Sequence, residues 1–289
     1  MTTEVPKNPI GLLYGLPNEA YHAGPGLSCT GMKELLRSPK HFYGKYIDPL
    51  RPPPEPKPGQ ELGQMFHAAL FEPAEFHLRY APGPAGVRRG TKKWDEFEAG
   101  LPRGVKAVKP EERDQAMNMA RSLRGVGDAR ELLSRGQPEV SAYAEFDVVD
   151  EDGEITKVLV RVRPDWVHDV KETSVILLDG KSCGDASIGE FSRQIAKKLY
   201  HMQAALYMDV YRKASGKEVL EFVFGQVETE WPHVGNTCAL YPDDIEKGRA
   251  LYRMALQAYV RCMKSGEWPG YSETVQLASL PAWTKGAAK

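Results

Sequence analysis

The chain has 289 residues, of which 42% are hydrophobic and 27% charged, and 38 basic residues nearly balance 39 acidic ones to give a net charge of −1. This composition is typical of a folded globular protein, and the length permits one large core or two small domains. A near-zero charge excludes a global positive field as the means of attracting nucleic acid. It leaves room for a nuclease, whose metal site needs carboxylates and whose phosphate contacts can be local.

The cysteines and the hydropathy pattern restrict the class of protein further. Cys29, Cys183, Cys238 and Cys262 are scattered without a Cys-x-x-Cys pair, which disfavours a zinc or iron–sulfur site and indicates free thiols in a reducing compartment. The first residues lack the basic-then-apolar pattern of a signal peptide, and no stretch approaches the ~20 apolar residues of a membrane span. We therefore expect a cytoplasmic protein with no membrane contact.

Helical patterns dominate the N-terminal half of the chain. Residues 1–20 are expected to form a flexible arm, and the proline-rich segment 49–58 an extended connector. Ser28 or Thr30 is expected to cap the first of several helices. These helices are predicted at 28–36, 40–47, 63–71 and 110–135, with a mobile loop at 81–105 that contains a short helix near Trp94.

Strand patterns dominate the second half. Apolar segments predict three strands, and Asp152-Gly153 is typical of a hairpin turn between the first two. The expected order is strands at 139–149, 155–168 and 174–179, a long helix at 189–214, strands at 220–228 and 237–240, and a helix at 242–265.

This order of elements favours an α/β fold with a mixed central β-sheet flanked by helices. We expect a single domain over residues 21–284, in which a helical part at 21–135 precedes a sheet-bearing core at 136–284. Residues 285–289 are expected to form a short tail.

Polar residues at the ends of two neighbouring strand patterns form the most informative feature. Asp165 ends the strand pattern 155–168, and Pro164 before it should make the strand bend or fray. Asp179 and Lys181 share one face of the next strand, with Gly180 between them. If the two strands are neighbours, both carboxylates and the ammonium group converge.

Such a group has the parts needed to cut a phosphodiester bond. Mg²⁺ prefers oxygen ligands, which Asp165, Asp179 and the Gly180 carbonyl could supply. The metal would stabilise charge on the phosphate and lower the pKa of a bound water, and Lys181 would orient or help to deprotonate that water. Taken singly, each of these aspartates is also consistent with an ordinary turn.

Further candidates lie on helices and at a strand start. Gln203 and Tyr207 are spaced i, i+4 on one helix face, where they could contact a phosphate or hold Lys181, or belong to an ordinary solvated face. His67, in an apolar helix, could be a metal ligand or a core histidine. Glu139 could add a carboxylate or lie at a solvated edge.

Several of these segments together resemble a known family. The chain is similar to RecE-type exonucleases of the PD-(D/E)xK superfamily, the lambda-exonuclease-like branch with a Gln-x-x-x-Tyr motif. The resemblance covers about residues 20–284 and also includes the opening segment YHAGPGLSCTGMKELLRSPKHF and the late WPGY and LPAW. It rests on the matching segments HAALFEPAEF from His67, RVRPD at 161–165, DGKS at 179–182 and YHMQAALYMDVY at 200–211.

The resemblance implies a restriction-endonuclease-like core and a 5′→3′ exonuclease that acts on double-stranded DNA ends with Mg²⁺ or Mn²⁺. It also implies a homo-oligomeric ring and a single-strand annealing partner of the RecT or Beta type in phage recombination. Carried over by position, His67, Asp165 and Asp179 match metal-site residues and Lys181 the catalytic lysine. Gln203 and Tyr207 match the helix motif, and Glu139 matches less closely. Asp179 stands where much of the superfamily has Glu.

The residues that would hold a DNA phosphate are less clearly indicated. Candidates are Arg37, Arg161, Arg163 and the basic loop with Arg88 and Arg89, which could equally be a solvated surface. Two other functions remain open at this point. One is a structure- or site-specific endonuclease on the same core, and the other is a non-catalytic DNA-binding recombination scaffold.

Overall fold

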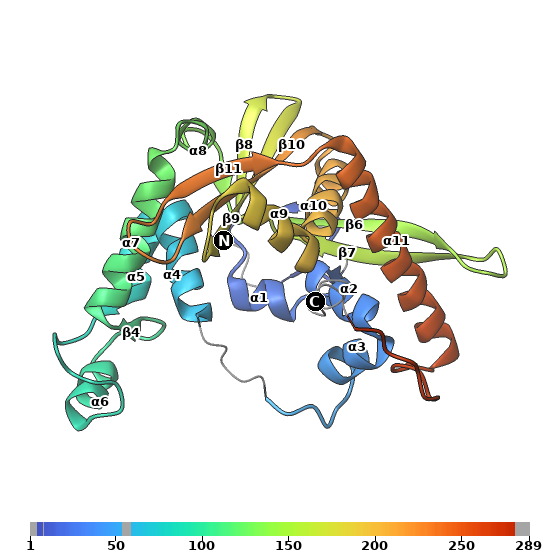
Figure 1. Cartoon of the computed structure of the whole chain (residues 1–289), viewed down its shortest axis with the longest axis horizontal. Coiled ribbons are helices and arrows are strands. Elements are labelled where there is room, and N and C mark those ends of the chain that lie inside the picture. Colours follow the sequence, from blue (N-terminus) through green and yellow to red (C-terminus); the bar gives the residue numbers. More distant parts are fainter. Residues whose placement is uncertain (1–4, 8, 54–58, 281–289) are drawn as a thin grey trace, which may run out of the picture.

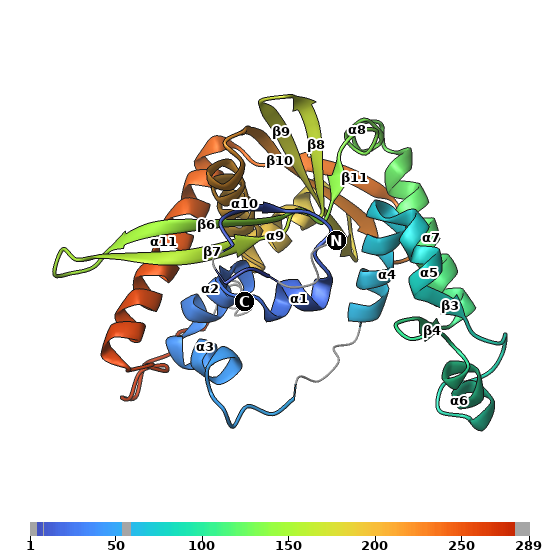
Figure 2. The same ribbon diagram turned by 180° about the vertical axis from the view of Figure 1, so that it is seen from behind.

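Two β-sheets with a helix between them organise the molecule (Figures 1 and 2). The computed structural model describes residues 5–7, 9–53 and 59–280. The five-stranded sheet has the order β11 (Gly235–Ala239), β10 (Glu218–Glu228), β9 (Ser174–Cys183), β8 (Trp166–Lys171) and β5 (Gln137–Pro138). The four-stranded sheet has the order β1 (Gly11–Leu13), β6 (Ser141–Val149), β7 (Ile155–Val162) and β2 (Leu27–Ser28). β3 (Tyr80–Pro82) and β4 (Lys106–Val108) form a separate pair.

The helices cover both sheets. Those of the N-terminal half are α1 (Asn18–Ala23), α2 (Cys29–Arg37), α3 (Pro39–Tyr46), α4 (Gln60–Phe71), α5 (Pro73–Arg79), α6 (Lys92–Ala99), α7 (Pro110–Gly125) and α8 (Gly127–Leu132). Those of the second half are α9 (Ile188–Lys197), α10 (Tyr200–Ser215) and α11 (Pro242–Ser265). In the described part of the chain, none of the helices is both long and apolar enough to cross a membrane.

The five-stranded sheet is mixed, as expected. β9 and β10 run parallel, which requires a crossover connection, and α9 and α10 provide it. β8 pairs antiparallel with β9, and β11 antiparallel with β10. Asp165, just before β8, and Asp179, within β9, therefore lie side by side on neighbouring strands.

The alternation of side chains along β9 assigns its two faces. Val175 and Leu177 are buried in the cluster that contains α10, whereas Leu178 belongs to the cluster formed with α4 and α7. Because successive residues of a strand point to opposite faces, Asp179 shares the α10 face and Gly180 the α4 face. This segment of β9 therefore contacts α10 on one face of the sheet and α4 on the other.

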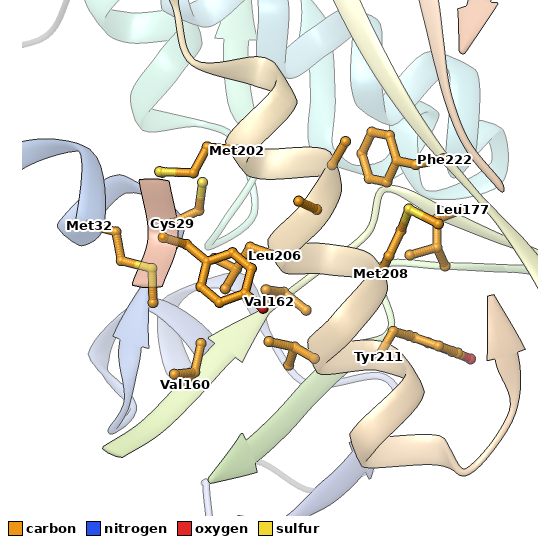
Figure 3. Close-up of a cluster of buried hydrophobic side chains, with 14 of the residues drawn as sticks. Cys29, Met32, Val160, Val162, Leu177, Met202, Leu206, Met208, Tyr211 and Phe222 are labelled. Atoms are coloured by element: carbon orange, nitrogen blue, oxygen red, sulfur yellow. The ribbon is translucent and has the colours of Figure 1, made fainter. Parts of the chain in front are cut away.

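Helix α10 lies in the core between the sheets. Figure 3 shows its side chains Met202, Leu206 and Met208, with residues of α2 and β7 on one side and residues of β9 and β10 on the other. The neighbours on the first side are Cys29, Met32, Val160 and Val162, and those on the second are Leu177 and Phe222. This burial holds the helix firmly, because interiors are close-packed.

Gly248 of α11 allows the close contact between α10 and α11. A Cβ added at this position would lie 2.2 Å from the backbone oxygen of His201. We expect Gly248→Ala to lower the free energy of unfolding by about 2 kcal/mol or more, because the helices must separate to admit the methyl group. Chemical denaturation followed by circular dichroism would measure the change.

Gly44 of α3 provides the matched control for this prediction. A Cβ there would meet nothing within 4 Å. Gly44→Ala should therefore leave stability unchanged or raise it by up to about 1 kcal/mol, through helix propensity alone. An equal loss of stability in the two variants would contradict the packing argument.

Three predicted elements are each divided in the structure, and the helix predicted at 110–135 is one of them, because it forms α7 and α8. The single strand predicted at 155–168 is wrong, because the chain leaves the four-stranded sheet at Val162 and enters the five-stranded sheet at Trp166. The long helix predicted at 189–214 is two helices, separated at Leu199, whose φ of 52° lies in the left-handed region. Such a φ is costly for a non-glycine residue, and here it reorients the chain into the core.

The flexible arm predicted for residues 1–20 is also wrong over its second part. β1 pairs antiparallel with β6, and Leu16 is 4% exposed, so this segment belongs to the core. Part of the predicted connector, 54–58, and the predicted tail, 285–289, lie outside the described residues. Confirmed features include the cap at Ser28, whose hydroxyl accepts from the Gly31 N–H, and the last helix at 242–265.

Candidate active site at the end of β8 and β9

The pairing of β8 with β9 brings the two predicted aspartates together. Trp166 stands opposite Leu178, so one further step along the antiparallel ladder places Asp165 opposite Asp179. Both aspartates are largely withdrawn from solvent, since the Asp165 side chain is 13% exposed and that of Asp179 only 2%. A buried pair of carboxylates requires positive or hydrogen-bonding partners, which are present.

Asp165 is held by two neighbours. Its Oδ2 accepts a hydrogen bond of 2.8 Å from the N–H of Gly180, and the same oxygen lies 3.3 Å from Nδ1 of His67. The three residues come from the β7–β8 junction, β9 and α4. The aspartate therefore joins the helical part of the chain to the sheet.

Asp179 is held by two other predicted residues, Lys181 and Gln203. The ammonium group of Lys181 donates to its Oδ2, and Nε2 of Gln203 donates to its Oδ1 at 2.6 Å. Gln203 is 8% exposed, so it is not a solvated residue of the helix surface. α10 thus positions a carboxylate of the neighbouring strand.

The protonation equilibria reflect this mixture of burial and charge. Burial opposes protonation of His67, but the Asp165 carboxylate outweighs it and raises the pKa of the imidazole to about 9. Burial also disfavours ionisation of Asp165, yet His67 and Lys181 bring its pKa below the usual value. For Asp179, burial and the neighbouring Asp165 prevail over Lys181, and its pKa is raised.

Gly180 is required for the close approach of α4 to β9. A Cβ at Gly180 would lie 3.0 Å from the ring of Phe71 and 3.4 Å from that of Phe66. Without a side chain on the strand, α4 packs closely enough for His67 to reach Asp165. The glycine therefore has a packing role besides the metal-ligand role predicted for its carbonyl, which stays a prediction.

Glu139 lies beside this group. Its backbone N–H donates to the Asp165 carbonyl at 3.1 Å, and its Oε2 is 3.8 Å from Nη1 of Arg163. Burial, followed by the Asp165 charge, raises the pKa of Glu139 well above its usual range. The structure thus places a third carboxyl group near the predicted pair.

Tyr207 lies one turn after Gln203 but in a different environment. Its ring packs edge-on against Phe222 with the centroids 5.9 Å apart, and burial raises the pKa of its hydroxyl. Within the described residues, the hydroxyl makes no hydrogen bond to Asp179 or Lys181. Its predicted catalytic contact therefore stays a prediction.

Arg161 and Arg163 contact the N-terminal segment, and only Arg163 also lies near a predicted site residue, Glu139. Both are buried, at 8% and 7% exposure. Arg161 donates to backbone carbonyls at the end of α1, including that of His22 at 3.0 Å, and Arg163 donates to the carbonyl of Leu16 at 2.9 Å. The structure contradicts their predicted phosphate role, because these guanidinium groups are used to attach the N-terminal segment to β7.

The other predicted phosphate ligands lie at the surface. Arg89 pairs with Glu61 at 2.9 Å and Glu112 at 2.6 Å, which offsets its charge, and Arg88 is exposed beside it. Arg37, in the last turn of α2, is exposed, and its Nε lies 3.4 Å from the Tyr271 hydroxyl. The structure does not bring these arginines into contact with Asp165, Asp179 or Lys181.

Sequence reasoning missed the surroundings of Tyr200. The ammonium groups of Lys33, Lys181 and Lys198 lie 5.2, 4.8 and 5.8 Å from the centre of its ring. A local sequence pattern does not indicate this cluster, because Lys33 and Lys181 are far from Tyr200 in the sequence. The Lys197-Lys198 pair just before Tyr200 is the one signal that could have suggested it.

Comparison with known proteins identifies the fold independently. Residues 28–281 match the family model described as a PDDEXK-like domain of unknown function (DUF3799). The chain belongs to this PDDEXK-like family. The match includes β8, β9 and α10, so the predicted restriction-endonuclease-like core is confirmed. A search of curated proteins gave no significant match.

The solved structures that align with the chain are distant in sequence. A "Putative exonuclease" from Eubacterium rectale aligns with a TM-score of 0.59 and 11% identity, over 96% of this chain and 99% of that chain. The structure of SSO0001 aligns with a TM-score of 0.35 and 11% identity, over 84% of this chain and 80% of that chain. The first similarity agrees with the family fold, whereas the second score is too low to establish one.

PDDEXK-like nucleases generally depend on a divalent metal, and the donor set here fits one. Among the described residues, no three His, Cys, Asp or Glu side chains are spaced to enclose an ion by themselves. Mg²⁺ does not need such a cage, because one or two carboxylates with water and substrate oxygens suffice. Asp165 and Asp179 would hold it, while His67, now paired to Asp165, stays a predicted ligand.

Gln203 offers a test of the positioning of Asp179. We expect Gln203→Leu to lower the cleavage rate by about 10- to 100-fold, because partners that orient a metal-binding carboxylate have effects of this size. The fold should be retained, since α10 is held by its apolar residues. Steady-state cleavage assays at several Mn²⁺ concentrations would measure the effect, and unchanged kinetics would contradict it.

Proposed function

We propose that this chain is a metal-dependent exodeoxyribonuclease that degrades linear double-stranded DNA from its 5′ ends in the cytoplasm. The observation that carries the proposal is a group of contacts around β8 and β9, which joins Asp165, Asp179, Lys181, His67 and Gln203. Membership of a PDDEXK-like family supports nuclease chemistry. The exonuclease character is supported by the description of the Eubacterium rectale protein as a "Putative exonuclease" and by the resemblance to RecE-type enzymes.

The residues of the site divide the work of phosphodiester hydrolysis. A bound Mg²⁺ or Mn²⁺ would supply charge stabilisation at the phosphate and a more acidic water. Lys181 places an ammonium group beside the Asp179 carboxylate, where it can balance phosphoryl charge and orient the attacking water. Gln203 and the Gly180 N–H hold the two carboxylates in place, and His67 balances the charge of Asp165.

Digestion of end-labelled DNA tests the proposal directly. A linear duplex with a label at the 5′ or at the 3′ end is incubated with the protein and Mg²⁺, Mn²⁺ or EDTA. We expect metal-dependent release of short products from the 5′ end first, and none with EDTA. Early release of the 3′ label instead would overturn the polarity that the resemblance implies.

A closed circular plasmid separates the proposed activity from the endonuclease alternative. It has no ends, so an exonuclease leaves it intact and degrades it only after linearisation. Nicking or linearisation of the circle would show an endonuclease on the same core. Binding of DNA without any metal-dependent cleavage would favour the scaffold alternative.

The resemblance also suggests assembly and partnership, which we propose on that basis. A homo-oligomeric ring around DNA would keep the enzyme on its substrate between cuts. A single-strand annealing protein would receive the strand that is left. Analytical ultracentrifugation and co-purification with a RecT-type protein test these two proposals, and a monomer that ignores the annealing protein would contradict them.

A further inference from the structure

Three ammonium groups surround one aromatic ring beside the candidate active site. Lys181 Nζ lies 4.8 Å from the ring centre of Tyr200, Lys33 Nζ 5.2 Å and Lys198 Nζ 5.8 Å. The lysines come from β9, α2 and the α9–α10 junction. The fold therefore gathers positive charge from three separate elements at one point, which we call the lysine cluster (Lys33, Lys181, Lys198).

The negative charge available to this cluster is small. Lys181 pairs with Asp179. In the described part of the chain, neither Lys33 nor Lys198 lies within salt-bridge distance of a carboxylate. Three cations next to two carboxylates, Asp179 and Asp165, still leave an excess of positive charge at the edge of the site.

Lys33 shows that the cluster is more than a solvated surface. It is half-buried on α2, and burial, together with the charges of Lys181 and Lys198, lowers its pKa. A lysine without an anionic partner gains nothing in stability from such a position. The Tyr200 ring compensates in part, because an aromatic face attracts ammonium groups.

An oxyanion is the ligand that this arrangement suits. Lysine binds phosphate as a point charge, and several ammonium groups around one point can share the oxygens of one group. Lys181 belongs both to the cluster and to the Asp179 pair, so an anion held by Lys33 and Lys198 would be adjacent to the reacting phosphate.

We propose that Lys33 and Lys198, positioned by Tyr200, bind a phosphate group of the DNA strand next to the phosphate that is cleaved. The inference rests on the proposed nuclease function and adds the residues that place the strand. The bound group is either a terminal 5′-phosphate or a phosphodiester within the strand. Both present the same oxyanion to the cluster, and the experiment distinguishes them.

Variants Lys33→Ala, Lys198→Ala and the double variant test the proposal. Lys197→Ala is the matched control for Lys198, since it is the adjacent exposed lysine and does not contact Tyr200, and Lys40→Ala on α3 is the control for Lys33. Binding is measured with EDTA present by fluorescence anisotropy of a short labelled duplex, so that the readout does not require cleavage. Lys→Arg at both positions tests rescue by charge.

We expect each alanine variant to weaken binding about tenfold, because a hydrogen bond to a charged group is lost. The slope of log Kd against log salt should fall by about one in the double variant, as expected when one phosphate contact is removed. In cleavage assays KM should rise while kcat changes little. The melting temperature without DNA should not fall, because like charges are removed.

The end group of the duplex identifies the phosphate. Loss of affinity confined to a 5′-phosphorylated duplex assigns a terminal phosphate, whereas equal losses on 5′-phosphoryl and 5′-hydroxyl ends assign an internal one. Alanine variants that bind DNA like their controls, with the same salt slope, would overturn the inference. If the wild-type protein binds DNA but never cleaves it, the proposed function fails and the binding data still decide this inference.

Discussion

Replacing Lys181 by methionine is expected to reduce cleavage of linear duplex DNA by at least about a thousandfold, equivalent to about 4 kcal/mol of transition-state stabilisation. The ammonium group of Lys181 donates to Asp179, and both residues lie on β9. Methionine keeps the length of the side chain and its apolar contacts but supplies neither charge nor a donor. End-labelled duplex degradation under single-turnover conditions would measure the loss.

Lys171→Met is the control for this experiment. Lys171 is exposed at the end of β8, so the same chemical change is made on the same sheet away from the site. Lys181→Met should also lower stability, by no more than the few kcal/mol found when a buried ion pair is broken, because Asp179 is left without its cation. A variant with near wild-type cleavage would exclude Lys181 from catalysis.

Asp165→Asn is expected to produce the second large effect, a loss of at least about a thousandfold in cleavage together with weakened Mn²⁺ binding. Asparagine has nearly the same shape and still accepts from the Gly180 N–H, but it lacks the charge that holds a divalent cation. The pairing with His67 is lost as well, so the pKa of His67 should fall from its raised value.

Isothermal titration calorimetry with Mn²⁺ measures the metal part of this prediction, and cleavage assays measure the catalytic part. Asp169→Asn is the matched control, since Asp169 lies on β8, the strand that follows Asp165, and pairs with Lys217 at the surface. Mn²⁺ binding equal to that of the wild type in Asp165→Asn would remove this residue from the metal site. Equal losses in both variants would point to a general effect of charge.

The strand-end motif was predictable because its information is local. Asp179, Gly180 and Lys181 follow a run of buried residues within one strand, and alternation alone places the two charged residues on one face. The contact of Gln203 with β9 was also predictable, because the helix that connects two parallel strands packs against the sheet that contains them. Local chemistry and chain connectivity point the same way here.

The assignment of the arginines failed for a physical reason that the sequence does not display. If residues 155–168 formed one strand, as the pattern predicts, alternation would place Arg161 and Arg163 on the same face as Asp165. The chain instead passes from one sheet to the other between Val162 and Trp166. Arg161 therefore packs with the four-stranded sheet and the N-terminal segment, whereas Asp165 packs beside the five-stranded sheet.

The lysine cluster is only weakly indicated by the sequence, through Lys198 close to Tyr200, because the other two lysines reach the ring through tertiary packing. Lys33 and Lys198 meet at Tyr200 only when α2 is packed against α10. The break at Leu199, which the continuous helical pattern conceals, is what turns the α9–α10 junction toward the site.

Because Asp165 lies in the passage between two sheets, its position relative to Asp179 depends on β7 as well as on the pairing of β8 with β9. Asp179 lies within β9, whereas Asp165 connects β7 to β8. Loosening the N-terminal segment that Arg161 and Arg163 attach to β7 would allow β7, and with it Asp165, to shift. Substitutions far from the carboxylates could then slow hydrolysis with the chemical groups unchanged, and the anchoring arginines would act as remote determinants of catalytic geometry.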